Sequence, residues 1–164
     1  MTAHPRCIAV IGRQGQLARE LADLAWPADL RPLFFGRTDI NLFDTGNLKS
    51  RLQSLRPLAI INTAAHTAVD LCESEPDVAR TLNADLPAVL ARIASHTGIP
   101  LVHVSTDYVF SGRQPRPFRE VDAAAPLSVY AQTKLAGETA VLAAGATSII
   151  IRSAGLFGRH GQNF

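Results

Sequence analysis

Three residues of the sequence form a set that could deliver a proton to a carbonyl oxygen. Tyr130 and Lys134 stand four residues apart in a segment with helical spacing, so their side chains share one face of that helix. A phenol titrates near pH ~10 in water, and a nearby ammonium lowers its pKa and makes it a usable acid near neutral pH. Thr106 ends an apolar run and offers a hydroxyl to the same substrate oxygen. A tyrosine–lysine pair also occurs on plain helix surfaces, but this combination favours catalysis.

A glycine-rich turn near the start of the chain predicts a dinucleotide-binding site. The residues Gly12-Arg13-Gln14-Gly15-Gln16-Leu17-Ala18 follow an apolar run and open an amphipathic segment. Gly12 allows a tight turn, Gly15 lets the backbone approach a pyrophosphate, and Ala18 lets the helix pack close to the strand. The alternative is an ordinary strand-to-helix turn that needs glycine, but its place after the first strand favours the cofactor.

The end of the second apolar run bears on the choice between NADPH and NADH. The sequence there reads Phe34-Phe35-Gly36-Arg37-Thr38, with no acidic residue directly after the run to bind the two ribose hydroxyls of NAD. Arg37 is able to pair with a 2′-phosphate, which favours NADPH, whereas a solvated arginine is the alternative.

The segments that must position these residues alternate between strands and helices. Short apolar runs typical of strands buried on both faces occur at Cys7–Ile11, Pro32–Phe35, Leu58–Asn62, Leu101–Ser105 and Ser148–Arg152. Leucines with helical spacing lie between them at 17–24 and 48–55, and longer helices are predicted over 78–93, kinked at Pro87, and over 130–144. The alternation predicts an α/β fold with a doubly wound parallel sheet of the Rossmann type, forming one NAD(P)-binding domain over 1–164.

Composition excludes several other classes of protein. The chain of 164 residues is 47% hydrophobic with a net charge of +2, which argues against disorder and against nucleic acid as a partner. Two cysteines cannot build a disulfide framework, and no apolar run approaches the ~18 residues of a membrane span. We expect a cytoplasmic protein with no membrane partner. The proline-containing stretch 111–128 is predicted to be a long functional loop.

The chain resembles the extended short-chain dehydrogenase/reductases, and within them the dTDP-4-dehydrorhamnose reductase family. The resemblance runs through almost the whole chain, and its most specific segments are Asn62 to Asp70, Glu73-Ser74-Glu75-Pro76, Ser105-Thr106-Asp107-Tyr108-Val109-Phe110, and Val129-Tyr130 with Lys134 to Glu138. It implies hydride transfer from NADPH or NADH to C4 of dTDP-4-dehydro-L-rhamnose, giving dTDP-L-rhamnose, with this nucleotide sugar as the substrate.

The resemblance also implies a role for each matching position. Tyr130 matches the proton donor, and Lys134 the residue that holds the nicotinamide ribose and tunes the tyrosine. Thr106 and Asp107 match substrate contacts. The other matching positions are predicted to bind the cofactor, with Asn41 a mild departure from the usual aspartate, and they are Gly12, Gly15, Gln16, Leu17, Arg37, Asn41, Leu42, Ala64, Ala65, His66 and Thr67.

Two departures from the family keep alternatives open. Gly155 stands where rhamnose-forming members typically carry a tryptophan against the sugar, which leaves a reductase of a different nucleotide sugar as an alternative. Family members also continue well beyond residue 164, so we expect the carboxyl-terminal substrate domain to be absent, and a truncated or regulatory NAD(P)-binding module without turnover is a second alternative. By resemblance Glu20 is a candidate for Mg²⁺ at a homodimer contact, although a surface acid is the simpler interpretation.

Overall fold

A five-stranded parallel sheet forms the centre of the computed structural model, which describes residues 6–39 and 44–161. The strand order is β2-β1-β3-β4-β5, and all four neighbouring pairs are parallel. The strands are β1 (Arg6–Ile11), β2 (Leu30–Phe35), β3 (Ala59–Asn62), β4 (Leu101–Thr106) and β5 (Ser148–Ser153). The doubly wound parallel sheet predicted from the sequence is therefore confirmed.

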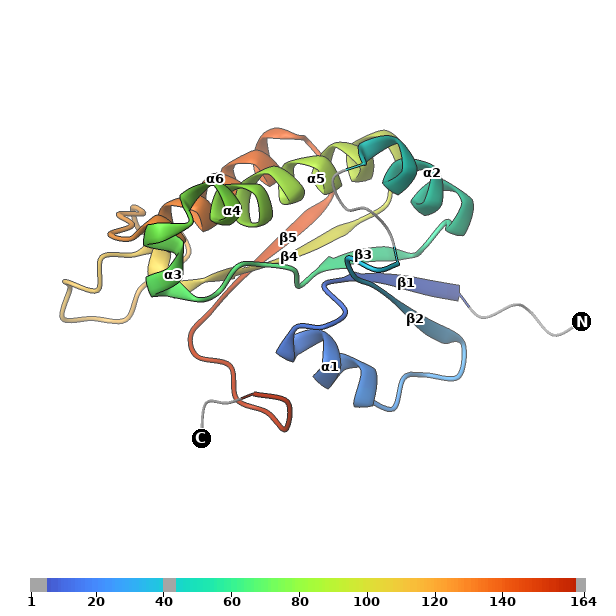
Figure 1. The fold of residues 1–164 in the computed structure, drawn as a ribbon, viewed down its shortest axis with the longest axis horizontal. Helices are drawn as coiled ribbons and strands as arrows, with labels where there is room; N and C mark the ends of the chain where they lie inside the picture. Colours follow the sequence, from blue (N-terminus) through green and yellow to red (C-terminus); the bar gives the residue numbers. More distant parts are fainter. Residues whose placement is uncertain (1–5, 40–43, 162–164) are drawn as a thin grey trace, which may run out of the picture.

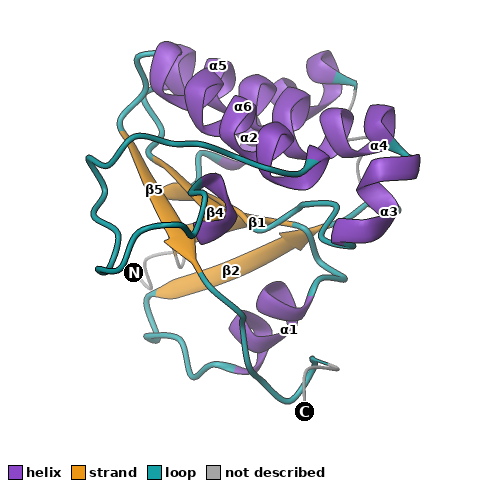
Figure 2. Ribbon diagram, turned by 90° about the vertical axis from the view of Figure 1, so that its left-hand side faces the viewer, coloured by secondary structure: helices purple, strands orange, loops and turns teal. Residues whose placement is uncertain are grey.

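The helices lie on both faces of the sheet, in unequal numbers. In Figures 1 and 2, α1 (Gln16–Asp23) lies on one face, whereas α2 (Thr45–Leu55), α4 (Pro76–Arg80), α5 (Leu86–Thr97) and α6 (Val129–Ala143) cover the other. The short α3 (Val69–Ser74) precedes α4. The main core lies on the crowded side, where Ile60 and Leu101 of the sheet pack with Leu86 and Leu90 of α5. None of the helices in the described ranges is long and apolar enough to cross a membrane.

The helix predicted over 78–93 is irregular just before Pro87. A π-helical turn (Thr81–Asp85) joins α4 to α5, and the backbone stays helical through Asp85 and Leu86. Pro87 lies in the first turn of α5, immediately after this turn, and has no amide proton to give to the helical ladder. Such π turns widen a helix locally and are frequent at functional sites. The predicted irregularity is therefore present, as a π-helical turn that ends two residues before the proline.

The chain reverses its direction of winding at β1. From β1 it runs through α1 to β2 at one edge, then returns through α2 to β3 on the other side of β1. In open parallel sheets ligands bind outside the carboxyl ends of the strands at such a reversal. The ends of β1, β3 and β4 therefore mark the place to look for a site.

A single carboxylate organises the loop 111–128. Asp122 accepts two hydrogen bonds from the Arg116 guanidinium, both 2.8 Å long, and a third of 2.8 Å from the backbone N–H of Arg119. Phe118 of this loop stacks on Phe110, with ring centroids 4.4 Å apart. The predicted loop has no helix or strand of its own, and these contacts give it a defined path.

Candidate active site

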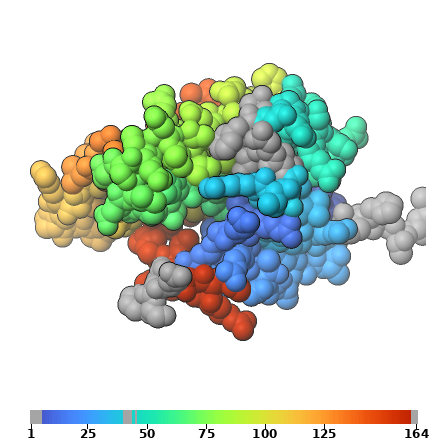
Figure 3. All heavy atoms as spheres, viewed as in Figure 1, coloured from blue at the N-terminus to red at the C-terminus, as the bar shows by residue number. Residues whose placement is uncertain are grey.

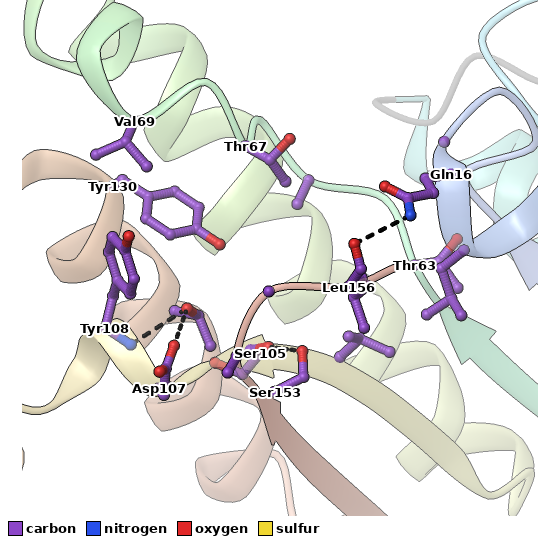
Figure 4. A pocket seen from close by; sticks show the side chains of 17 residues that line it. Gln16, Thr63, Thr67, Val69, Ser105, Asp107, Tyr108, Tyr130, Ser153 and Leu156 are labelled. Atoms are coloured by element: carbon purple, nitrogen blue, oxygen red, sulfur yellow. Dashed lines mark hydrogen bonds between the residues drawn. The ribbon is translucent and has the colours of Figure 1, made fainter. Parts of the chain in front are cut away.

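A cavity of about 460 Å³ lies at the carboxyl ends of the central strands. Figure 4 shows the Tyr130 phenol oxygen directed into it, with Gln16 and Leu156 on the opposite side. Of the predicted catalytic and turn residues, Thr106, Tyr130, Gly15, Gln16 and Leu17 line this cavity, whereas Lys134 and Gly12 do not. Its lining is formed by Gly15, Gln16, Leu17, Thr63, Ala65, Thr67, Val69, Val104, Ser105, Thr106, Asp107, Tyr108, Tyr130, Ser153, Ala154, Gly155 and Leu156.

The glycine turn closes tightly against the end of β3. Gly12 has a φ of 112°, and a Cβ there would lie 2.7 Å from the Ala64 nitrogen and from Thr63 Oγ1, so no other residue fits. The N–H of Gly15 donates to the Gly12 carbonyl at 2.8 Å, and Gly15 then caps α1. Ala18 is fully buried, as its predicted packing against the strand requires.

A second, smaller cavity of about 120 Å³ adjoins the turn on its other side. Arg13, Gly36 and Arg37 line it, together with Ala64 and Ala65 from the segment after β3. Gly15 and Ala65 line both cavities. The glycine turn therefore lies between a larger and a smaller space.

An ion pair at the end of β2 was not anticipated from the sequence. Asp39 accepts a hydrogen bond from Arg13 Nη1 at 2.7 Å and another from the Gly36 N–H at 2.9 Å. The acidic residue that binds here is not directly after the strand, because Asp39 comes four positions after Phe35 and folds back to the Gly36 N–H. Arg13 and Arg37 therefore meet at the smaller cavity, and one of them is already paired with a carboxylate.

Asn83 in the π-helical turn fastens the segment after β3 to α6, a role that the sequence did not reveal. Its Oδ1 accepts from the N–H of His66 at 2.8 Å, and its Nδ2 donates to the His66 carbonyl at 3.1 Å and to Thr133 Oγ1 at 3.2 Å. Gly137 of α6 packs so closely that a Cβ there would overlap the Asn83 carbonyl oxygen. The asparagine is fully buried, so both ends of its amide are used for positioning.

Tyr130 lies in the first turn of α6, and its surroundings favour the neutral phenol. Ser128 caps the helix by accepting from the Ala131 N–H at 3.1 Å. Burial raises the pKa of Tyr130, and the nearby Asp107 adds to this, whereas hydrogen bonding with the Thr106 hydroxyl lowers it. The expected lowering of this pKa by Lys134 is therefore not what the chain alone shows, because burial dominates. A neutral phenol is the form that donates a proton.

The Lys134 side chain reaches from α6 into the sheet. It is 2% exposed, and its Nζ donates to the Val104 carbonyl at 2.7 Å. Burial lowers the pKa of Lys134 to about 8, while the carboxylate of Glu138, one turn further along α6, acts in the opposite sense. Glu138 is itself buried and bonded to Arg152 of β5, with Nη2 2.6 Å from Oε2.

The segment after β5 crosses the mouth of the large cavity to reach α1. Gln16 Nε2 donates to the Leu156 carbonyl at 3.1 Å, and the N–H of His160 donates to Glu20 Oε1 at 2.8 Å. Figure 3 shows this segment (red) lying against α1 (blue). Gly155 lines the cavity at the position where the resemblance expects a tryptophan.

Glu20 contacts the segment after β5. One oxygen of its carboxylate accepts the His160 N–H at 2.8 Å, and no group of three His, Cys, Asp or Glu side chains in the described ranges of this single chain could hold a metal ion. A Mg²⁺ site shared between two subunits at Glu20 stays a prediction.

Three of the predicted cofactor residues are not placed at the cavities by the structure. Asn41 and Leu42 lie outside the described residues. The His66 ring is directed to Glu75, with Nε2 3.5 Å from Oε2, and its backbone is held by Asn83, so this residue shapes the segment after β3 through its main chain. Ala64, Ala65 and Thr67 of the same segment line the two cavities, and their contact with the cofactor stays a prediction.

The two cavities and the turn between them fit a dinucleotide. A nicotinamide dinucleotide needs backbone N–H groups at a helix start that come close to its pyrophosphate. The Gly12 turn and the beginning of α1 supply such a backbone. The Arg13 and Arg37 side chains at the smaller cavity suit an anionic group on the adenosine side. Ser105 Oγ lies buried at the large cavity and has no hydrogen-bond partner among the described residues.

A parallel Rossmann-type sheet, a glycine turn at its first strand and a Thr–Tyr–Lys set on β4 and α6 define an extended short-chain dehydrogenase/reductase. A comparison with protein-family profiles matches residues 6–164 to the RmlD substrate binding domain. The chain belongs to this family.

Relatives and solved structures agree with that assignment. A dTDP-4-dehydrorhamnose reductase of Sinorhizobium fredii is 41% identical, over 96% of this chain and 53% of that protein. A probable dTDP-4,6-dihydroxy-2-methyloxan-3-one 4-ketoreductase of Streptomyces antibioticus is 37% identical, over 94% and 53%. The crystal structure of a Bacillus anthracis dTDP-4-dehydrorhamnose reductase in complex with NADP matches with a TM-score of 0.93 at 32% identity, covering 98% of this chain and 57% of that one. The chain spans about half the length of these relatives.

Proposed function

We propose that this chain acts in the reduction of the 4-keto group of dTDP-4-dehydro-L-rhamnose to dTDP-L-rhamnose, with NADPH or NADH as the reductant. The observation that carries the proposal is the Tyr130 phenol, which faces the same cavity as Thr106 and the glycine turn. The relatives named dTDP-4-dehydrorhamnose reductase support this choice of substrate. We expect the reaction to take place in the cytoplasm, and the protein to form a homodimer.

Two segments of the chain would hold the cofactor. The backbone of Gly12, Gly15, Gln16 and Leu17 would hold the pyrophosphate, while Ala64, Ala65 and Thr67 would lie along the cofactor. The nicotinamide, when bound, supplies a hydride.

Tyr130 would give its proton to the carbonyl oxygen of the substrate, the Thr106 hydroxyl would donate a hydrogen bond to the same oxygen, and Asp107 would contact the substrate elsewhere. Burial raises the pKa of Tyr130 and keeps the proton on the phenol until it is needed. In the chain alone Thr106 donates to Asp107 Oδ1 at 3.3 Å and accepts from the Tyr108 N–H at 3.2 Å, and its single proton would turn from Asp107 to the carbonyl oxygen when substrate binds. Lys134 would supply positive charge below the cofactor ribose and the phenol.

The test has two stages, binding and turnover. Nicotinamide fluorescence is followed on adding the chain to NADPH and then to NADH, and a chain that binds neither contradicts the proposal. Absorbance of the reduced nicotinamide is then followed with the dTDP-4-keto sugar, using Tyr130→Phe beside the unaltered chain. We expect the variant to bind cofactor normally and to lose turnover at least ~100-fold. Binding without turnover in the unaltered chain would instead indicate a cofactor-binding module.

The arginines at the smaller cavity allow a test of the preference for NADPH over NADH, in which one arginine variant is compared with a control arginine variant. We propose that Arg37, with Arg13, favours NADPH by meeting the 2′-phosphate. Loss of one charged hydrogen bond corresponds to about 1.5–3 kcal/mol, or roughly a 10- to 100-fold higher Kd. Arg37→Ala should therefore weaken NADPH but leave NADH unchanged. Arg31→Ala, on β2 outside that cavity, is the control and should change neither.

A different keto sugar is the second candidate for the substrate. Gly155 leaves open space at the cavity, because a Cβ there would meet only the Phe157 ring, at 4.0 Å. The Streptomyces antibioticus relative is named for a different 4-keto sugar. Comparing rates with several dTDP-4-keto sugars, in the unaltered chain and in Gly155→Trp, decides between the substrates. A rate with dTDP-4-dehydro-L-rhamnose far below that with another sugar would favour the second candidate.

A further inference from the structure

Tyr108 is a half-exposed aromatic residue at the large cavity. It lies in the 3₁₀-helical turn (Asp107–Val109) that follows β4 directly. The next two residues of the chain, Val109 and Phe110, are buried, whereas Tyr108 is 52% exposed and lines the cavity. The turn therefore presents this ring to the cavity and not to the core.

The main chain of Tyr108 holds the Thr106 hydroxyl. The Tyr108 N–H donates to Thr106 Oγ1 at 3.2 Å, and the turn is closed by the Phe110 N–H, which donates to the Asp107 carbonyl at 3.0 Å. A hydroxyl oxygen can accept a hydrogen bond and still donate its own proton. The bond from Tyr108 therefore fixes where the Thr106 oxygen lies and leaves its proton available to another acceptor.

The side chain of Tyr108 packs against the ring of Tyr130. The two ring centroids are 5.9 Å apart and the planes are inclined by 80°. Aromatic pairs favour this edge-to-face arrangement because the ring face is negative and the ring edge positive. Figure 4 shows the two rings side by side at one wall of the cavity. Tyr130 also packs with Cys72 and Ala79, so its ring is held by a buried cluster as well as by Tyr108.

We propose that Tyr108 is a positioning residue that joins Thr106 to Tyr130, with its main chain placing the threonine hydroxyl and its ring holding the phenol ring. Both hydroxyls would act on the same carbonyl oxygen, so their mutual placement matters, and a misplacement of ~1 Å can cost a reaction about 100-fold. The use of this arrangement in catalysis rests on the function proposed above. The contact between the rings does not, and it can be measured without cofactor or substrate.

The Tyr108 ring also keeps water from the Tyr130 phenol. Burial is the largest cause of the raised pKa of Tyr130, and a neighbouring ring contributes to that burial. Removing the ring should let water approach the phenol and lower its pKa toward the ordinary value of ~10. The other titratable and charged groups on the elements that pack around the phenol are Cys72, Glu73, Asp107 and Lys134.

The chain is suited to this test because its two tyrosines are Tyr108 and Tyr130. Any substitution at position 108 leaves Tyr130 as the single tyrosine. Tyr108→Phe keeps the ring, Tyr108→Leu keeps an apolar side chain without a ring, and Tyr108→Ala removes both. Leu142→Ala is the control, because Leu142 lies on α6 like Tyr130, is 67% exposed and lines a different cavity. Thermal unfolding confirms that each variant is folded.

NMR of chains with carbon-13-labelled tyrosine tests the contact in the absence of ligands. We expect a nuclear Overhauser effect between the two rings in the unaltered chain, and its absence would overturn the inference. Among the single-tyrosine chains, the midpoint of the Tyr130 titration should be lower in Tyr108→Ala than in Tyr108→Phe by about 0.5–1 pH unit. Equal midpoints would contradict the inference.

Turnover with NADPH and the dTDP-4-keto sugar tests the positioning itself. We expect kcat to stay within ~3-fold of the unaltered chain in Tyr108→Phe and to fall at least ~10-fold in Tyr108→Leu and Tyr108→Ala. The Kd for NADPH should not change in any of them, and Leu142→Ala should change neither quantity. An equal loss of kcat in Tyr108→Phe and Tyr108→Ala would show that the ring contact is not what matters. An unaltered chain without turnover contradicts the proposed function alone, and the two NMR measurements then decide the inference.

Discussion

Replacing Gly137 by alanine tests whether the π-helical turn and α6 are packed as tightly as the structure indicates. Gly137 lies within α6, where alanine is ordinarily better than glycine by about 1 kcal/mol. Here its Cβ would overlap the Asn83 carbonyl oxygen and approach Pro87 Cγ to 3.4 Å. The obstructing atom belongs to the backbone, so it cannot rotate away, and overpacking of this kind costs about 1–3 kcal/mol. We expect Gly137→Ala to lower the free energy of unfolding by about 2 kcal/mol.

Urea unfolding followed by circular dichroism measures that change, and Gly46→Ala supplies the control. Gly46 lies in α2, and a Cβ there would meet only Asp44 Oδ1, at an ordinary 3.5 Å. The control should gain about 0.5–1 kcal/mol from helix propensity. Displacing Asn83 should also loosen its bonds to His66 and weaken NADPH binding, by roughly tenfold for a loss of ~1.4 kcal/mol. A gain in stability for Gly137→Ala equal to that of Gly46→Ala would refute this packing.

Three further outcomes follow from buried or paired charges. The pKa of His103 is about 3 in the folded chain, so between this value and pH ~6.5 only the unfolded chain binds a proton there. The free energy of unfolding therefore falls as the pH drops below ~6.5. From pH ~6.5 to ~4.5, urea unfolding should show a fall in this free energy that is about 2–3 kcal/mol larger in the unaltered chain than in His103→Gln. Glu138→Ala leaves Arg152 without its buried partner and should cost about 3 kcal/mol by the same assay. Arg116 and two other donors hold the pKa of Asp122 well below its usual range, so this carboxylate stabilises its loop above pH ~4 and loses that effect in acid. Asp122→Asn should therefore speed cleavage of the loop 111–128 by trypsin at neutral pH.

The central strands of the sheet were predictable because they have neighbouring strands on both sides, whereas the predicted burial on both faces is wrong for the edge strand β5, where Ile149 and Ile151 are exposed. Ile8 to Ile11 and Ile60 to Asn62 form nearly continuous apolar runs, and the observed ends differ from the predicted ones by at most two residues. The glycine turn was also predictable from the sequence, because Gly12 adopts a backbone conformation that other residues rarely take. In these segments the local residue preferences favour the same backbone structure that the complete fold requires.

The parts that escaped prediction depend on contacts between distant residues. Asn83 is an ordinary helical asparagine in the sequence, and its role arises only because the π-helical turn directs it between His66 and Thr133. The placement of Lys134 was missed for a similar reason. Helical spacing places Lys134 on the same face of α6 as Tyr130. Its amino group donates to the Val104 carbonyl, and this carbonyl lacks a strand partner because β3 ends at Asn62.

The π-helical turn also sets which changes of length the chain can tolerate. It adds backbone between two helical stretches that serve different clusters, since Ala79 packs with Cys72 and Tyr130, whereas Leu86 packs in the main core. Removing one residue from Thr81–Asp85 would allow a regular helical ladder. It would also rotate the earlier stretch by about 100° relative to the later one. Among relatives, an insertion or deletion in these five positions would therefore be far rarer than one in the loop 111–128.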